Sequence, residues 1–181
     1  MRFLSKTPTL SLNVAFKKQK PLRNEFDTFK AELITLLDSI DGKETEEFHK
    51  NLVSDFLKNA FYKDRNYINT KEKKDLVIHT GLDNKTPVGV IIEAKRPKGN
   101  ENEMFSIAKP NTKALHELIL YYFEERSKAN NTELKHLVLT NIYEWFLFDA
   151  NEFDKHIYRN TKIKKLYDTF ESDSKDKPFF Y

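Results

Sequence analysis

Three charged residues, Asp75, Glu93 and Lys95, stand where a protein could hold a divalent metal ion. Asp75 begins a run rich in apolar residues, and Glu93 and Lys95 end a second such run. Residues 81–87 between the runs contain glycine, asparagine and proline, which predicts two strands joined by a turn. In an antiparallel pair the end of one strand lies beside the start of the other, and residues two apart share a face. We therefore expect the three side chains to meet at one edge of a sheet.

Electrostatic repulsion would make this trio a costly choice for packing alone. Two carboxylates about 4 Å apart repel one another by roughly 4 kcal/mol at an effective dielectric constant near 20. A bound Mg²⁺ converts that repulsion to attraction, because hard cations take carboxylate and water oxygens as ligands. Asp75 and Glu93 are the candidate metal ligands, and Lys95 would lie near a water molecule and the phosphate that it attacks.

The rest of the chain predicts the helices and strands that would position this site. Apolar residues at helical spacing predict helices over residues 23–39, 45–62, 112–129 and 160–170. Further strands are predicted at residues 66–70, 134–140 and 145–149. This order is typical of an α/β domain with a mixed central sheet flanked by helices. Thr45 is the predicted N-cap of the second helix, and Glu46 falls near the apolar face of that helix.

Composition limits the class of protein. The 181 residues suit a single domain, in which we expect residues 1–21 to form an irregular, basic segment. The formal net charge is only +3, although the sequence pI is about 8.8, so nucleic-acid binding would need a local basic patch. There are no cysteines, which excludes disulfides and thiolate metal sites and fits a reducing compartment. No apolar run approaches the roughly 20 residues of a membrane span, so we expect a cytoplasmic protein.

The site residues resemble the signature of the PD-(D/E)XK nuclease superfamily, an aspartate on one strand and Glu-x-Lys on the next. Here the signature is Asp75 followed by Glu93-Ala94-Lys95, with Lys74 where many members have proline. Residues 72–74 and 133–135 also spell Glu-x-Lys. Only the copy ending at Lys95 closes a strand that follows an aspartate-led strand, so its context carries the prediction.

This resemblance implies a restriction-endonuclease-like core of helix, three-stranded meander, helix and strand. It also implies that Mg²⁺, or Mn²⁺ in its place, binds Asp75, Glu93 and the Ala94 carbonyl. Lys95 would then be a catalytic residue, and Glu46 an auxiliary catalytic acid supplied by the helix before the meander.

Three longer segments, residues 46–57, 91–97 and 139–149, resemble the amino-terminal nuclease region of type IIG restriction–modification enzymes. The resemblance spans most of the chain. It implies cleavage of double-stranded DNA, a methyltransferase and target-recognition region in the same polypeptide, and a transient dimer on DNA. No methyltransferase motif is present, so we expect a fragment of such a polypeptide or a separate subunit.

Several of these residues have simpler interpretations. Glu93 and Lys95 could form a solvent-facing ion pair worth roughly 0–1 kcal/mol, although apolar residues on both faces of their strand favour a central position. Glu46 could merely interact with the helix dipole. Arg96 and Lys98 could contact DNA phosphates, but a loop with two cations is usually solvated.

One helix face offers a further candidate, made of Lys113, Glu117 and Tyr121. It resembles the Gln-x-x-x-Tyr element of some superfamily members, with glutamate in place of glutamine. We interpret it as a solvated face. Three other functions fit the same chain: a repair or junction-resolving nuclease, a non-catalytic module that binds DNA or a partner, and a structural domain of a larger enzyme.

Overall fold

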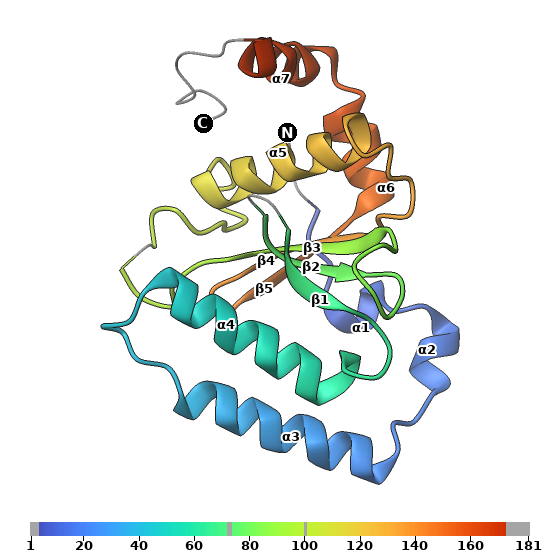
Figure 1. The fold of residues 1–181 in the computed structure, drawn as a ribbon, viewed down its shortest axis with the longest axis vertical. Helices are drawn as coiled ribbons and strands as arrows, with labels where there is room; N and C mark the ends of the chain where they lie inside the picture. The colour runs from blue at the N-terminus through green and yellow to red at the C-terminus, as the bar shows by residue number, and fades with distance from the viewer. Residues whose placement is uncertain (1–3, 72–73, 100, 173–181) are drawn as a thin grey trace.

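Five strands form one mixed sheet in the computed structural model, which describes residues 4–71, 74–99 and 101–172. Their order is β1-β2-β3-β4-β5 (Figure 1). The bounds are β1 Ile68–Lys71, β2 Lys74–His79, β3 Val88–Ala94, β4 His136–Thr140 and β5 Trp145–Asp149. β3 and β4 are parallel and the other neighbouring pairs are antiparallel. The predicted mixed α/β class is confirmed.

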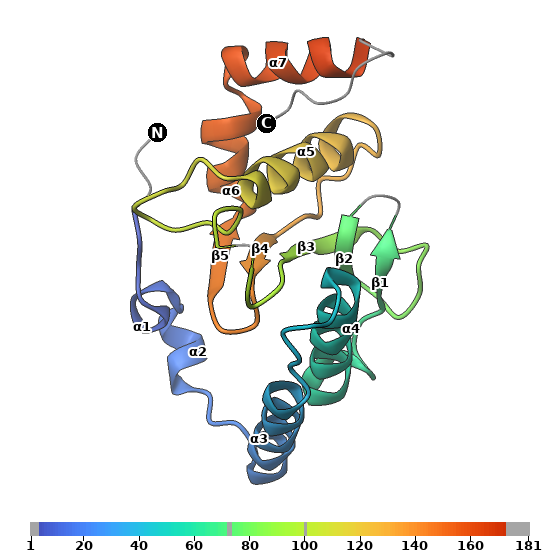
Figure 2. The same cartoon turned by 90° about the vertical axis from the view of Figure 1, so that its left-hand side faces the viewer.

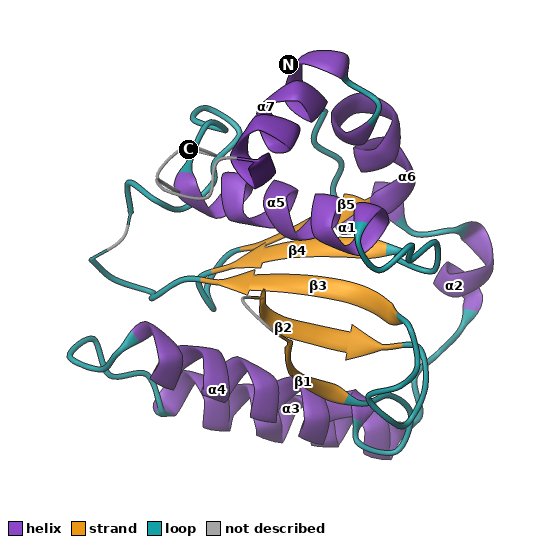
Figure 3. Ribbon diagram, turned by 45° about the horizontal axis from the view of Figure 1, so that its top comes forward, coloured by secondary structure: helices purple, strands orange, loops and turns teal. Residues whose placement is uncertain are grey.

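Helices cover both faces of this sheet (Figures 1 and 3). On one side lie α3 (Arg23–Asp38) and α4 (Glu46–Leu57), which continues as the π-helix η1 (Lys58–Tyr62). On the other side lie α5 (Lys113–Ser127), α6 (Ala150–Phe153), the π-helix η2 (Asp154–Tyr158) and α7 (Thr161–Ser172). Within the described ranges, no helix is long and apolar enough to cross a membrane.

β3 is the central strand because apolar side chains cover both of its faces. Ile91 belongs to the core cluster that includes Leu118 of α5, whereas Ile92 belongs to the cluster that includes Val53 of α4. The alternation follows from the period of two along a strand. Each fully buried side chain of this kind contributes roughly 1.5–3 kcal/mol. Two separate cores therefore hold β3, and with it the residues at its end, in place.

Two features position the helices near the end of β3: the crossover connection that contains α5 and the N-cap of α4. A parallel neighbour needs a crossover connection, and α5 provides it between β3 and β4. On the opposite face, the Thr45 hydroxyl accepts a hydrogen bond from the Phe48 N–H at 3.1 Å, which confirms the predicted N-cap of α4. Figure 1 shows α4 and α5 both beginning on the side of the sheet where β3 ends.

Two short helices occur where the sequence predicts an irregular segment. They are α1 (Pro8–Ser11) and α2 (Val14–Lys18), and neither contains a buried residue. Thr7 and Asn13 cap them by accepting backbone N–H bonds. A capping residue followed by proline was the signal that the prediction missed. Figure 2 shows both helices to one side of the layers formed by α3, α4 and α5.

Candidate active site at the end of strand β3

Lys95 follows directly after β3, and the sheet holds its backbone. Its N–H donates to the Thr140 carbonyl of β4 at 2.8 Å, which extends the pairing of the two strands by one residue. The side chain is 2% exposed. A lysine buried to this degree needs negative partners, because an unpaired buried charge is strongly destabilising.

Three carboxylates from three different elements surround the Lys95 ammonium. Nζ lies 2.6 Å from Glu93 Oε1 of β3 and 2.7 Å from Glu117 Oε2 of α5. It also donates to Glu46 Oε1 of α4 at 3.3 Å. Glu93 is 1% exposed and Glu117 14%, whereas Glu46 is 36% exposed. The ammonium is thus shared between the buried Glu93, the partly buried Glu117 and the more exposed Glu46, and we call these four residues the Lys95 cluster.

The neighbouring carboxyl groups stabilise the charge on the Lys95 ammonium. Burial disfavours the ammonium, but the charges of Glu93 and Glu117 outweigh burial and raise the pKa of Lys95. Burial likewise works against ionised Glu117, yet a hydrogen bond with Glu93 and the charge of Lys95 lower the pKa of Glu117. Three carboxyl groups therefore surround one ammonium, so acidic groups outnumber cations in the cluster.

The pairing of β2 with β3 indicates where the Asp75 backbone lies relative to the site. Leu76 lies opposite Ile92, so continuing the antiparallel pairing by one residue sets Asp75 opposite Glu93. Its side chain lies outside the part of the molecule that the structure describes. Ala94, whose carbonyl is the third predicted metal ligand, is the buried last residue of β3 and lies opposite Thr140.

The interpretation of Glu117 as part of a solvated helix face is wrong. Its carboxylate contacts Lys95, and Tyr121, one turn later, is only 7% exposed. Lys113, one turn earlier, is 46% exposed and lies 4.0 Å from Glu117 Oε1. The face therefore runs from solvent into the core along α5. An aromatic residue, Tyr121, four positions after the glutamate on the same helix face is the sequence signal that favoured an inward face.

Arg96 and Lys98 lie at the rim of the site rather than within the Lys95 cluster. Arg96 is partly buried and Lys98 is exposed. A Cβ atom at Gly42 would lie 3.7 Å from Cδ of Lys98, which places this loop beside the turn between α3 and α4. The Arg96 guanidinium stays beside its own loop, since a Cβ atom at Gly99 would lie 3.6 Å from Nη2 of Arg96.

The carboxylates fit a hard divalent cation by their chemistry. Carboxylate oxygens are the ligands that Mg²⁺ prefers, and acidic groups outnumber cations in the Lys95 cluster. Among the side chains that the structure describes, no three His, Asp or Glu residues are grouped to hold a metal ion. The carboxylates converge on the Lys95 ammonium instead, and the Asp75 side chain is not in that described set.

A second buried carboxylate on α5 serves as a contrast. Glu125 is 2% exposed, and its Oε1 lies 3.0 Å from Nζ of Lys71. Asn131 donates to Oε2 at 2.9 Å and also to the Val88 carbonyl at 2.8 Å. These contacts join β1, α5 and the start of β3 around a carboxylate that is met by a cation and an amide. Such an arrangement is sufficient for structure alone.

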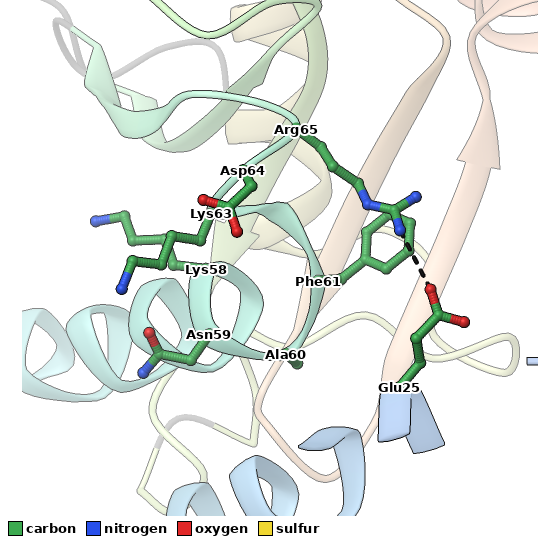
Figure 4. Close-up of a pocket in the computed structure, with 8 residues that line it drawn as sticks. All are labelled: Glu25, Lys58, Asn59, Ala60, Phe61, Lys63, Asp64 and Arg65. Atoms are coloured by element: carbon green, nitrogen blue, oxygen red, sulfur yellow. Dashed lines mark hydrogen bonds and ion pairs between the residues drawn. The ribbon is translucent and has the colours of Figure 1, made fainter. Parts of the chain in front are cut away.

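A cavity of about 340 Å³ lies elsewhere, at the far end of α4 and along η1 (Figure 4). Arg65 lies over the Phe61 ring, 4.2 Å from its centroid, and contacts Glu25 of α3 at 3.2 Å. The side chains of Arg65 and Glu25 are 53% and 40% exposed, so this contact contributes little. The candidate chemistry is therefore at the Lys95 cluster and not in this cavity.

A family match covers almost the whole chain, from residue 6 to residue 181. The chain belongs to the family described as Domain of unknown function (DUF7149). No curated protein and no solved structure matches it. All four residues of the Lys95 cluster, together with Asp75, fall inside the matched range.

Proposed function

We propose that this domain is a metal-dependent DNA endonuclease that hydrolyses phosphodiester bonds. The observation that carries the proposal is the Lys95 cluster itself, where a buried lysine is shared by carboxylates at the end of the central strand. Asp75 lies opposite Glu93 in the continued strand register, as the PD-(D/E)XK resemblance requires. Three carboxyl groups around one buried ammonium are a poor device for stability and a good one for binding a divalent ion.

Asp75, Glu93 and the Ala94 carbonyl would hold the ion, Mg²⁺ or Mn²⁺. When bound, the ion supplies Lewis-acid chemistry, polarising the scissile phosphate and lowering the pKa of a water molecule. Lys95 remains cationic in the described arrangement, so its ammonium is suited to stabilise the negative charge that develops on the phosphate. Glu46 contacts Lys95 from the exposed side and is placed to orient groups that enter from solvent.

Double-stranded DNA is the proposed substrate, and Arg96 and Lys98 at the rim are candidates for phosphate contacts. Affinity that depends on phosphate contacts falls steeply with salt concentration. By the narrower resemblance, the domain would be the cleavage module of a cytoplasmic type IIG restriction–modification enzyme. A methyltransferase and target-recognition region would accompany it in the same polypeptide, and a transient dimer would form on DNA.

Cleavage of a supercoiled plasmid with Mg²⁺ tests this proposal. We expect the wild-type chain to nick or linearise the plasmid and Lys95→Ala to lose that activity. Lys135→Ala is the matched control, since Lys135 ends another Glu-x-Lys tripeptide but its side chain is 64% exposed. Equal cleavage by wild type and Lys95→Ala would overturn the proposal. Preference for a branched junction over a linear duplex would instead identify a junction-resolving nuclease.

A further inference from the structure

Lys95 and a metal ion would compete for the same carboxylate. An ammonium has three N–H donors, and in the Lys95 cluster three carboxylates surround it. Glu93 makes the shortest of these contacts, at 2.6 Å, and Glu93 is also the proposed metal ligand. A divalent ion that takes the Glu93 oxygens withdraws the nearest counter-charge from Lys95.

Glu117 is the carboxylate best placed to keep Lys95 in position at that moment. Its Oε2 lies 2.7 Å from Nζ, whereas the Glu46 oxygen is 3.3 Å away on a side chain that is 36% exposed. Glu117 stands on α5, outside the strand pair that carries the proposed metal ligands. Its other oxygen lies 4.0 Å from Nζ of Lys113, so cations face the carboxylate on two sides.

We propose that Glu117 is a positioning residue that retains the Lys95 ammonium when a divalent cation takes Glu93. This inference rests on the proposed function, because it requires a cation at Glu93. In the metal-free protein Glu93 and Glu117 share Lys95, and in the metal-loaded protein Glu117 holds it beside the phosphate. Glu117 therefore acts through Lys95 and does not touch the reacting atoms.

Nuclear magnetic resonance of the lysine ammonium groups in the full chain tests this inference without measuring catalysis. A buried, paired ammonium exchanges its protons slowly with water and gives a visible Hζ–Nζ signal, which is lost when the group is freed. The Lys95 signal is identified by its disappearance in Lys95→Arg. We compare wild type, Glu117→Gln and Glu103→Gln, each with and without Mg²⁺. Glu103 is the matched control, because it contacts Lys113 at 3.4 Å instead of Lys95.

We expect the Lys95 signal to persist on addition of Mg²⁺ in wild type and in Glu103→Gln. In Glu117→Gln it should be present without Mg²⁺ and lost with it. Loss in Mg²⁺-loaded wild type would show that the ion takes Glu117 as well, and persistence in Mg²⁺-loaded Glu117→Gln would show that another group holds Lys95. Either result overturns the inference.

Calorimetry separates this failure from failure of the proposed function. If wild type binds Mg²⁺ but the signals do not follow the expected pattern, only the role of Glu117 is overturned. If wild type binds no Mg²⁺ in the presence or absence of duplex DNA, the proposed function fails, and this inference fails with it.

Discussion

Two copies of the Glu-x-Lys pattern, residues 93–95 and 133–135, lie in opposite environments in this fold. In the first, the Glu93 and Lys95 side chains are 1% and 2% exposed and lie 2.6 Å apart. In the second, the Glu133 and Lys135 side chains are 54% and 64% exposed and lie 3.8 Å apart. The first copy closes a strand between two cores, whereas the second precedes β4 in a loop. The preceding strand therefore determines whether the two side chains at this spacing are buried together or exposed to solvent.

The largest expected contrast between the copies is in DNA cleavage. If the proposed function holds, we expect Glu93→Ala to lower the Mg²⁺-dependent cleavage rate by at least about 10²–10³-fold, because it removes a proposed ligand of the charge-stabilising ion. Glu133→Ala should remain within about threefold of wild type, as surface changes of this kind are nearly neutral. Single-turnover rates on a short duplex measure both. Equal loss in the two variants would mean that burial does not separate them.

Substitution of Lys95 should lower the free energy of unfolding by several kcal/mol more than substitution of Lys135. Lys95→Met leaves the buried Glu93 and the partly buried Glu117 without their ammonium, which should cost about 3 kcal/mol in the metal-free protein. Lys135→Met should cost no more than about 0.5 kcal/mol. Urea unfolding followed by circular dichroism gives both free energies. A Lys95→Met protein as stable as wild type would show that the cluster tolerates unbalanced charge.

Mg²⁺ should raise the thermal stability only of those proteins in which residues 93–95 are unchanged. A ligand at 100 times its dissociation constant adds about 2.7 kcal/mol by mass action. For a chain of this size that corresponds to roughly 5–10 °C in the unfolding midpoint. We expect this shift in wild type and Glu133→Gln and its loss in Glu93→Gln, measured by thermal unfolding. A shift that survives in Glu93→Gln would place the ion elsewhere.

The smallest expected effect is a pH dependence at Glu117. Its pKa is lowered in the folded protein, so its ionised form stabilises the fold. This contribution is complete above the usual value of 4.5 and is lost as the pH falls through the lower folded-state pKa. Wild type should exceed Glu117→Gln in stability by no more than about 1 kcal/mol at pH 6. In urea unfolding from pH 6 to pH 3, that difference should shrink; a constant difference would contradict the assignment.

The burial of residues 93–95 at the end of a central strand could be predicted because the sequence patterns that indicate it are local. Apolar residues on both faces of the strand indicated a central position, and the turn at residues 81–87 set the register that places Asp75 opposite Glu93. The N-cap at Thr45 was also correct, because a capping hydroxyl acts within one turn of helix. Strand identity and helix capping could thus be predicted from short-range patterns.

Glu117 could not be assigned in the same way. Whether a helical glutamate faces solvent or a strand depends on how the helix rotates as it packs, and apolar residues elsewhere on α5 set that rotation. The approach of α5 to Lys95 is likewise a product of the crossover, whereas the helical pattern of α4 had already indicated an inward Glu46. Long-range packing therefore supplied the part of the site that spacing alone did not reveal.

Titration calorimetry of Mg²⁺ into wild type, Glu93→Gln and Glu133→Gln, each with a duplex present, tests the central claim most directly. The claim is that the Lys95 cluster and Asp75 form a divalent-cation site. We predict binding in wild type and Glu133→Gln and at least a tenfold weaker affinity, about 1.4 kcal/mol, in Glu93→Gln. Equal Mg²⁺ affinity in all three proteins, or no binding in wild type, would contradict it.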